Sequence, residues 1–149
     1  GALAYGDDWL ERNADALAAF SIPHTVSRWE DWRGHVDFEK TLGILRCIWE
    51  QDAKLREIIT ADVERFIRNN PSASQNPAVS PELRLQNGIS YLLEEMAGLS
   101  LFALTHDSFE VYAGPKITAI DYLKESRPAG VPMELLQWKS LKIDFRAAQ

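Results

Sequence analysis

The residues with the clearest chemical potential in this sequence are a tyrosine and a glutamate four positions apart, Tyr91 and Glu95. A spacing of four places a phenol and a carboxylate one turn apart on the same face of a helix. Arg84, Gly88 and Gly98 fall on that face too, so it is polar and has two positions without a side chain. We expect such a face to leave room for a ligand. An exposed glutamate over an ordinary core helix is the alternative that the spacing leaves open.

This pair has the chemistry of a proton-transfer site. A carboxylate in a partly apolar pocket has a pKa raised toward the working pH range, so Glu95 can accept a proton there. The phenol of Tyr91 can donate a hydrogen bond to a developing oxyanion, or pass a proton without carrying charge itself. The pair can therefore combine binding with proton transfer.

Composition bounds the architecture and the partners. The 149 residues, of which 46% are hydrophobic, can bury one core, which predicts a single domain over 1–149. A formal charge of −6 argues against a simple polyanion-binding module, although a local basic patch stays open. The single cysteine, Cys47, excludes an internal disulfide and a Cys-rich metal site, which indicates a cytoplasmic protein. Its apolar neighbours predict a buried side chain.

Several other kinds of site have no signal. The sequence contains no Gly-rich phosphate loop, no CxxC and no HExxH, and its three histidines are scattered. We therefore predict neither a cofactor nor a metal. No apolar run approaches the ~18 to 20 residues that span a bilayer, so no membrane association is expected. Trp29 and Trp32 are close enough to stack on a base, but anchoring the start of a helix in the core is the simpler interpretation.

Apolar periodicity predicts a chain dominated by helices. The long helix that carries Tyr91 opens at Ser80, a capping residue, with Pro81 at the first helical position, where its missing N–H costs nothing. Asp52 can cap the helix before it. The predicted helices cover 8–20, 30–49, 52–69, a long segment from 80 to about 99, and 116–124.

Short alternating segments predict a few strands. Segment 109–112 alternates and ends at Tyr112, and segment 140–145 alternates well enough to be the last strand. Segment 21–27 is expected to be extended, as an edge strand, because Pro23 cannot donate to a sheet ladder. Helices with a few scattered strands indicate a small sheet.

Four motifs occur in a characteristic order. They are Trp29-Glu30-Asp31-Trp32, Val79-Ser80-Pro81-Glu82-Leu83-Arg84, Tyr91-Leu92-Leu93-Glu94-Glu95 and Val111-Tyr112-Ala113-Gly114-Pro115. This order resembles the C-terminal half to two-thirds of the tRNA-dependent cyclodipeptide synthases, over residues 27 to 145. The most specific part is the Tyr-x-x-x-Glu helix followed by a tyrosine that ends a strand.

The resemblance implies a fold, an activity and site residues. Members of that family resemble class I aminoacyl-tRNA synthetases in fold, take two aminoacyl-tRNAs and release a 2,5-diketopiperazine. The implied fold class is α/β: a helix-rich, Rossmann-like partial domain with a small, mostly parallel sheet. By the same resemblance Tyr91 and Glu95 hold the amino group of the first aminoacyl moiety, with Glu95 as the proton acceptor. Tyr112 matches the strand-end tyrosine that helps to position the aminoacyl group.

The sequence departs from the family pattern in three places. Ala113 follows Tyr112, where one branch of the family has proline and another a polar residue. Met96 and Ala97 stand where proline often follows the helix glutamate. The family's covalent nucleophile is a serine after the first strand, and we find no segment that matches it. The basic helix that grips tRNA also lies upstream of the matched region, whereas the predicted helix 8–20 is acidic.

Two further residues are candidates for substrate binding. Gly98 lies three residues after Glu95 on the same side of the helix, and Glu110 lies two before Tyr112 on the same strand face. Similar positions in the family help to line the first side-chain pocket. A glycine and a carboxylate there would favour a long polar or basic side chain. A solvated Glu110 is the alternative.

These observations leave more than one class of function open. The first is an aminoacyltransferase that forms cyclic dipeptides from aminoacyl-tRNAs, incomplete in this chain because the segment with the serine nucleophile is missing. The second is a non-catalytic binding or assembly domain, or one subunit of a split enzyme. An unrelated helical interaction domain is the third. A partial sheet would expose an edge, so we expect the missing N-terminal half, a partner subunit or a homodimer to cover it.

Overall fold

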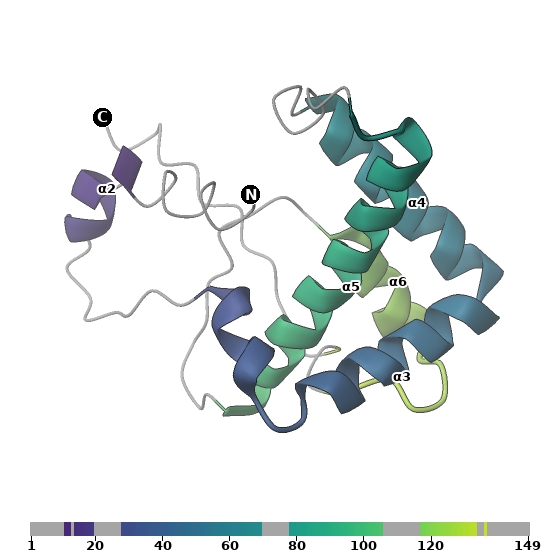
Figure 1. Ribbon diagram of the computed structural model, residues 1–149. Coiled ribbons are helices and arrows are strands. Elements are labelled where there is room, and N and C mark those ends of the chain that lie inside the picture. Colours follow the sequence, from purple (N-terminus) through teal and green to yellow (C-terminus); the bar gives the residue numbers. More distant parts are fainter. Residues whose placement is uncertain are drawn as a thin grey trace.

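The computed structural model describes residues 11, 12, 14–19, 28–69, 78–105, 117–133 and 136. Figure 1 shows that these residues are arranged mainly as helices. In chain order the elements are α2 (Ala14–Ala18), the 3-10 helix η1 (Trp29–Gly34), α3 (Phe38–Gln51), α4 (Ala53–Asn69), α5 (Pro81–Thr105) and α6 (Thr118–Ser126).

The predicted fold class is wrong for the part of the chain that the structure describes. An α/β, Rossmann-like partial domain with a small, mostly parallel sheet was expected, but every regular element among the described residues is a helix. The physical reason is that these helices bury their apolar faces against one another and use no sheet surface. The segments predicted as strands, 21–27, 109–112 and 140–145, lie outside the described residues.

The longest helix, α5, is central and packs against η1, α3 and α4. It begins as predicted, because Ser80 Oγ accepts a hydrogen bond from the Leu83 N–H at 3.2 Å and Pro81 is the first helical residue. Every residue of segment 96–101 is buried, so α5 has neighbours on all sides over that stretch.

One residue, Asp52, forms the corner between α3 and α4. Its backbone N–H donates to the Ile48 carbonyl at 2.9 Å, which ends α3. Its side-chain Oδ1 accepts from the N–H groups of Lys54 and Leu55 at 2.9 and 3.0 Å, which caps α4. The predicted cap is confirmed. The Arg56 side chain also donates to a carbonyl in the last turn of α3 at 3.2 Å.

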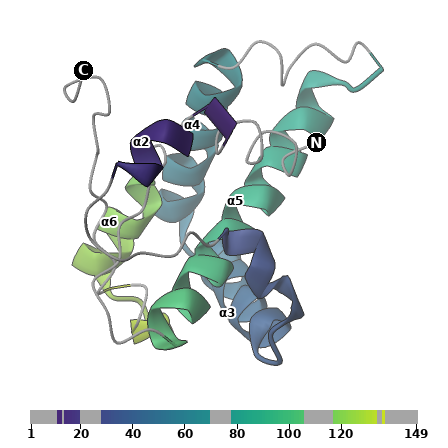
Figure 2. The same ribbon diagram turned by 90° about the vertical axis from the view of Figure 1, so that its left-hand side faces the viewer.

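A buried carboxylate joins α4 to α6. Asp62 is only 8% exposed, and its Oδ2 accepts a hydrogen bond from the Thr118 N–H at 2.9 Å. Ile117, the residue before α6, has no side-chain oxygen with which to cap that helix. Asp62 therefore supplies the cap from another helix, and its second oxygen pairs with Arg65. Figure 2 shows α6 beside α4.

The predicted helix faces form most of the core. The stripes of α3, α4 and α5 meet in one cluster, to which α6 and the start of η1 contribute. Phe66, predicted to be in the stripe of α4, is 43% exposed. The residues that are at most 2% exposed include Leu42, Leu45, Leu55, Ile59, Met96, Ala97, Leu101, Ala119 and Leu123.

Two local predictions differ from the structure. The expected helix over 30–49 is two elements, because η1 ends at Gly34 and α3 begins at Phe38. In the turn between them the backbone N–H of Asp37 donates to His35 Nδ1 at 3.1 Å. Cys47 is exposed and not buried, and Gln51 Nε2 lies 3.2 Å from its sulfur. It falls opposite the buried stripe of α3, so its apolar sequence neighbours do not cover it.

Candidate functional site on helix α5

The structure places Tyr91 and Glu95 one turn apart on α5, as their spacing predicts. Both side chains are partly buried. The pKa of the Tyr91 phenol is raised to about 12, mainly by burial and further by the negative charges of Glu95 and Glu30. The two carboxylates therefore act on the same phenol, and Tyr91 stays protonated over the physiological pH range.

The partners of the Tyr91 hydroxyl come from η1. The indole N–H of Trp29 donates to the hydroxyl oxygen at 3.2 Å. The hydroxyl donates to Glu30 Oε1 at 3.4 Å, which is a long hydrogen bond. The rings of Trp29 and Tyr91 also meet edge to face, with centroids 5.1 Å apart and planes at 84°. Residues about 60 positions apart in the chain thus enclose one phenol.

A second set of contacts holds η1 on α5. Arg33 Nη2 lies 2.7 Å from Glu94 Oε2 in an ion pair, and the Arg33 guanidinium lies 4.7 Å from the centre of the Trp29 ring. Ser90 Oγ donates to the other oxygen of Glu94 at 3.4 Å. Glu94 is therefore engaged by Arg33 and Ser90, while the charge of Glu95, its neighbour in sequence, acts on Tyr91.

The two glycines of this helix face have packing roles. A Cβ at Gly98 would come within 2.7 Å of the Trp29 carbonyl oxygen, and a Cβ at Gly88 within 2.4 Å of Val63 Cγ1. Gly98 therefore lets η1 approach α5, and Gly88 lets α4 approach it. Protein atoms occupy the space beside both glycines, which were expected to leave room for a ligand. The role of Gly98 in a substrate pocket stays a prediction.

The remaining predicted site residues, Tyr112 and Glu110, lie outside the described residues. The structure therefore brings together Tyr91, Glu95 and Gly98. Sequence reasoning missed Glu30 and the polar contact of Trp29, because the Trp29-Glu30-Asp31-Trp32 motif was interpreted as a helix start and as part of the family resemblance. Burial of Trp29 confirms that this tryptophan anchors η1 in the core.

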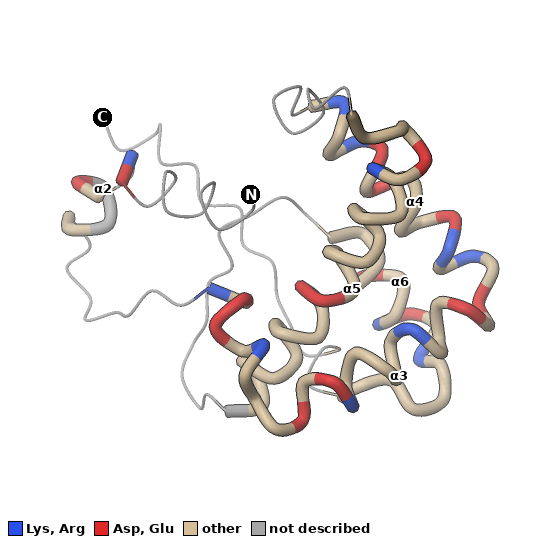
Figure 3. Tube along the Cα trace, in the orientation of Figure 1, with Lys and Arg blue, Asp and Glu red and all other residues tan. Residues whose placement is uncertain are grey.

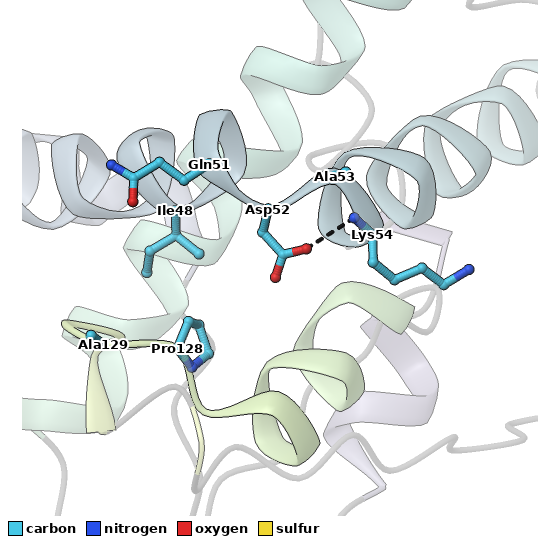
Figure 4. Close-up of a pocket in the computed structure, with 7 residues that line it drawn as sticks. All are labelled: Ile48, Gln51, Asp52, Ala53, Lys54, Pro128 and Ala129. Carbon is cyan, nitrogen blue, oxygen red and sulfur yellow. Dashed lines mark hydrogen bonds between the residues drawn. The ribbon is translucent and has the colours of Figure 1, made fainter.

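A hollow of about 420 Å³ lies elsewhere, at the corner between α3 and α4. Figure 4 shows Asp52 facing this hollow, with Pro128 on the opposite side. The Tyr122 hydroxyl lies 3.0 and 3.2 Å from the two Asp52 oxygens. The Leu55 backbone N–H, followed by that Tyr122 hydroxyl, lowers the pKa of Asp52, whereas the hydrogen bond to Asp52 raises the pKa of Tyr122. This carboxylate is therefore held by two backbone N–H groups and one hydroxyl of the protein itself.

The distribution of charged side chains and of potential metal ligands bears on which ligand the described residues can bind. Figure 3 shows Lys and Arg interspersed with Asp and Glu along α3 and α4, so neither helix has the purely basic run that a polyanion would favour. Within the described ranges, no group of three or more His, Cys, Asp or Glu side chains is placed to hold a metal ion. No described helix is long and apolar enough to cross a membrane.

Comparison with known proteins shows a similarity in fold to a solved structure. The sequence matches no protein-family model and no curated protein. Its structure is similar to the solved structure of a CDPS, a cyclodipeptide synthase, from Fluoribacter dumoffii, with a TM-score of 0.65 and 24% sequence identity. The match covers 83% of this chain and 55% of that chain, so this chain spans about half the length of that protein. The resemblance inferred from the sequence motifs is thus confirmed at the level of the fold.

Proposed function

We propose that this chain contributes to an aminoacyltransferase of the cyclodipeptide synthase type, which uses aminoacyl-tRNAs to form cyclic dipeptides. One observation carries the proposal: a Tyr-x-x-x-Glu pair lies on the central helix of a chain that is similar in fold to a cyclodipeptide synthase. That similarity is structural and covers about half of the relative. The reaction and its substrates are therefore part of what we propose, and so is the assignment of residues 1–149 to one domain.

The proposed reaction needs an amine that has lost its proton. An aminoacyl group carries an ammonium at neutral pH, and only the neutral amine attacks an acyl carbon. In the proposal Glu95 takes that proton, so the ammonium becomes an amine and the carboxylate becomes a carboxylic acid. Tyr91 binds the amino group, and Tyr112 helps to position the aminoacyl moiety. No residue of this chain is assigned as the covalent nucleophile.

The state of Tyr91 supports a binding role. With a pKa of about 12, the phenol is neutral near pH 7 and cannot act as the base. The nearby Glu95 carboxylate supplies the negative charge that favours a cation at this position. Glu94 is one position away but is already paired with Arg33. We assign the proton acceptor to Glu95, because its charge acts on the Tyr91 phenol that binds the amino group.

The proposal is tested by expressing the chain in a bacterial host and measuring diketopiperazines in the medium by mass spectrometry. Where a cyclic dipeptide is formed, we expect Glu95→Gln to lower its yield by a factor of about 100 or more, since general base catalysis contributes about 10²- to 10⁴-fold. Glu94→Gln is the matched control, because it removes the adjacent carboxylate, and it should keep most of the yield.

Two results would contradict the proposal. One is a product whose yield does not depend on Glu95. The other is no product together with no binding of an aminoacyl amide, measured by calorimetry on the purified chain. Binding that depends on Glu95 but yields no product would instead favour the second candidate, a binding subunit of the same fold.

A further inference from the structure

The hydrogen bonds of Tyr91 favour one direction of its hydroxyl group. A phenol has one proton to donate and two lone pairs that accept. The Trp29 indole N–H occupies one lone pair at 3.2 Å. The proton is directed to Glu30 Oε1 at 3.4 Å. One lone pair remains for a ligand, so this phenol can still accept a hydrogen bond but has no further proton to offer.

Packing between η1 and α5 determines where these partners lie. The close approach of the Trp29 backbone to Gly98, the edge-to-face contact with Tyr91 and the stacking of Arg33 on the Trp29 ring hold the indole in place. Glu30 follows Trp29 in the same turn of η1.

We infer that Trp29 and Glu30 are positioning residues that orient the Tyr91 hydroxyl, with its proton toward Glu30 and its open lone pair toward the amino group of the substrate. This inference rests on the proposed function, because it assumes that an amino group binds beside Tyr91. It assigns a role to η1 that the sequence motifs did not predict. It also makes the Tyr91 phenol a hydrogen-bond acceptor for the substrate and not a proton relay.

In the proposed reaction Tyr91 and Glu95 therefore have different roles, hydrogen-bond acceptor and proton acceptor. The substrate ammonium donates one N–H to the phenol oxygen, and it loses one proton to the Glu95 carboxylate. Tyr91 keeps its own proton throughout, as its high pKa allows. Of the other charged groups of η1 and α5 near the phenol, Arg33 and Glu94 neutralise each other. Tyr91 is thus an acceptor and not a proton relay.

A spectroscopic experiment on the full chain tests the orientation without any substrate. Hydrogen exchange of the five tryptophan indole protons is followed by NMR in the wild-type protein, Tyr91→Phe and Glu94→Gln. Loss of one hydrogen bond should speed exchange of the Trp29 indole proton roughly threefold to tenfold in Tyr91→Phe, and leave the other four indoles unchanged. Glu94→Gln should change exchange at Trp29 less than Tyr91→Phe does, because Glu94 acts on that indole only through Arg33. Unchanged exchange at Trp29 in Tyr91→Phe would overturn the inference.

The role of Glu30 is tested separately by Raman spectroscopy, in which the intensity ratio of the tyrosine doublet distinguishes donor from acceptor hydroxyls. The Tyr91 contribution is isolated by subtracting the Tyr91→Phe spectrum. Trp29→Phe should shift Tyr91 toward a donor-only pattern, and Glu30→Gln should weaken the donor character. A Tyr91 signal that neither variant changes contradicts the assignment, provided that near-ultraviolet circular dichroism shows each variant to be folded.

Product formation then separates this inference from the proposed function. Glu30→Gln should lower the diketopiperazine yield roughly tenfold, as loss of one oriented charged hydrogen bond predicts. A wild-type chain without product and without amine binding would refute the proposed function, while the exchange and Raman data together would still decide the orientation of Tyr91. A wild-type chain that makes product, with Glu30→Gln making equally much, would refute the positioning role and leave the proposed function intact.

Discussion

Two regions of this molecule pair a tyrosine with an acidic residue, and they differ in the contacts of the tyrosine hydroxyl. At the corner between α3 and α4, Asp52 accepts hydrogen bonds from two backbone N–H groups and from the Tyr122 hydroxyl. On α5, Tyr91 lies under the influence of Glu95 and Glu30, and its one donated hydrogen bond to Glu30 is long.

The difference teaches how to distinguish a structural pair from a functional one. Asp52 caps a helix, so its negative charge is already compensated by backbone dipoles and its pKa is lowered. Near Tyr91, burial and then the negative charges of Glu95 and Glu30 raise the pKa of the partly buried phenol to about 12. The Asp52–Tyr122 pair contributes to stability, whereas we propose that the negative charge beside the partly buried Tyr91 favours a cationic ligand.

The largest expected effect concerns the contact that builds the α5 site. Gly98→Ala should destabilise the protein by about 1 to 3 kcal/mol, because the new Cβ would meet the Trp29 carbonyl oxygen at 2.7 Å. Gly43→Ala is the matched control: Gly43 lies in α3 with nothing within 4 Å of an added Cβ. That substitution should stabilise the protein by up to about 1 kcal/mol. Denaturant unfolding of both variants checks the prediction, and equal effects of the same sign would contradict it.

A smaller effect is expected at the α3–α4 corner. Asp52→Ala removes the cap of α4 and the partner of Tyr122, which should cost about 1 to 2 kcal/mol of unfolding free energy. Asp52→Asn should cost less, because asparagine also caps helices well. Thermal unfolding measures both variants. A diketopiperazine yield that falls with folded Asp52→Ala would break the distinction between a structural and a functional pair.

The stability that Asp52 contributes at the same corner should depend on pH. The pKa of Asp52 is lowered in the folded state, chiefly by the Leu55 N–H, below its unfolded value of about 3.9. Its charge therefore adds stability above about pH 4, and that stability is lost as the pH falls through the folded pKa. The gap in unfolding free energy between wild type and Asp52→Asn should be constant near neutral pH and narrow on acidification. A gap that widens in acid would show that the sign is wrong.

The smallest effect is expected for the ion pair at the edge of the α5 site. Arg33 and Glu94 are partly exposed, with side chains 45% and 23% accessible, so their pair should contribute at most about 1 kcal/mol. Denaturant unfolding of Arg33→Gln, Glu94→Gln and the double variant gives the coupling energy of the pair in a double-mutant cycle. This coupling energy should become smaller in high salt. A coupling well above that range would mean that η1 is held by charge more than by packing.

Local features of this fold were predictable from the sequence. Ser80 and Pro81 mark the start of α5, and Asp52 caps α4, because helix ends depend on residues close in sequence. The one-turn spacing of Tyr91 and Glu95 is a property of any helix, so their shared face followed from the sequence as well. The buried stripes of α3 and α4 followed from periodicity in the same way.

Features that depend on distant residues were not predictable. Nothing near Tyr91 in the sequence indicates that Trp29 and Glu30 meet its hydroxyl, because that contact depends on how η1 packs on α5. Gly98 has a packing role for the same reason. The sheet was predicted from short alternating segments, and in the described chain the apolar faces of α3, α4 and α5 are covered by other helices instead.

The most direct test of the distinction between the two tyrosines is a paired measurement on Tyr91→Phe and Tyr122→Phe. Each variant removes one hydroxyl oxygen, and for each we would measure the diketopiperazine yield and the midpoint of thermal unfolding. The account predicts that Tyr91→Phe loses most of the product, while Tyr122→Phe keeps the yield and lowers the unfolding midpoint. A yield that falls with Tyr122→Phe and is retained with Tyr91→Phe would contradict it.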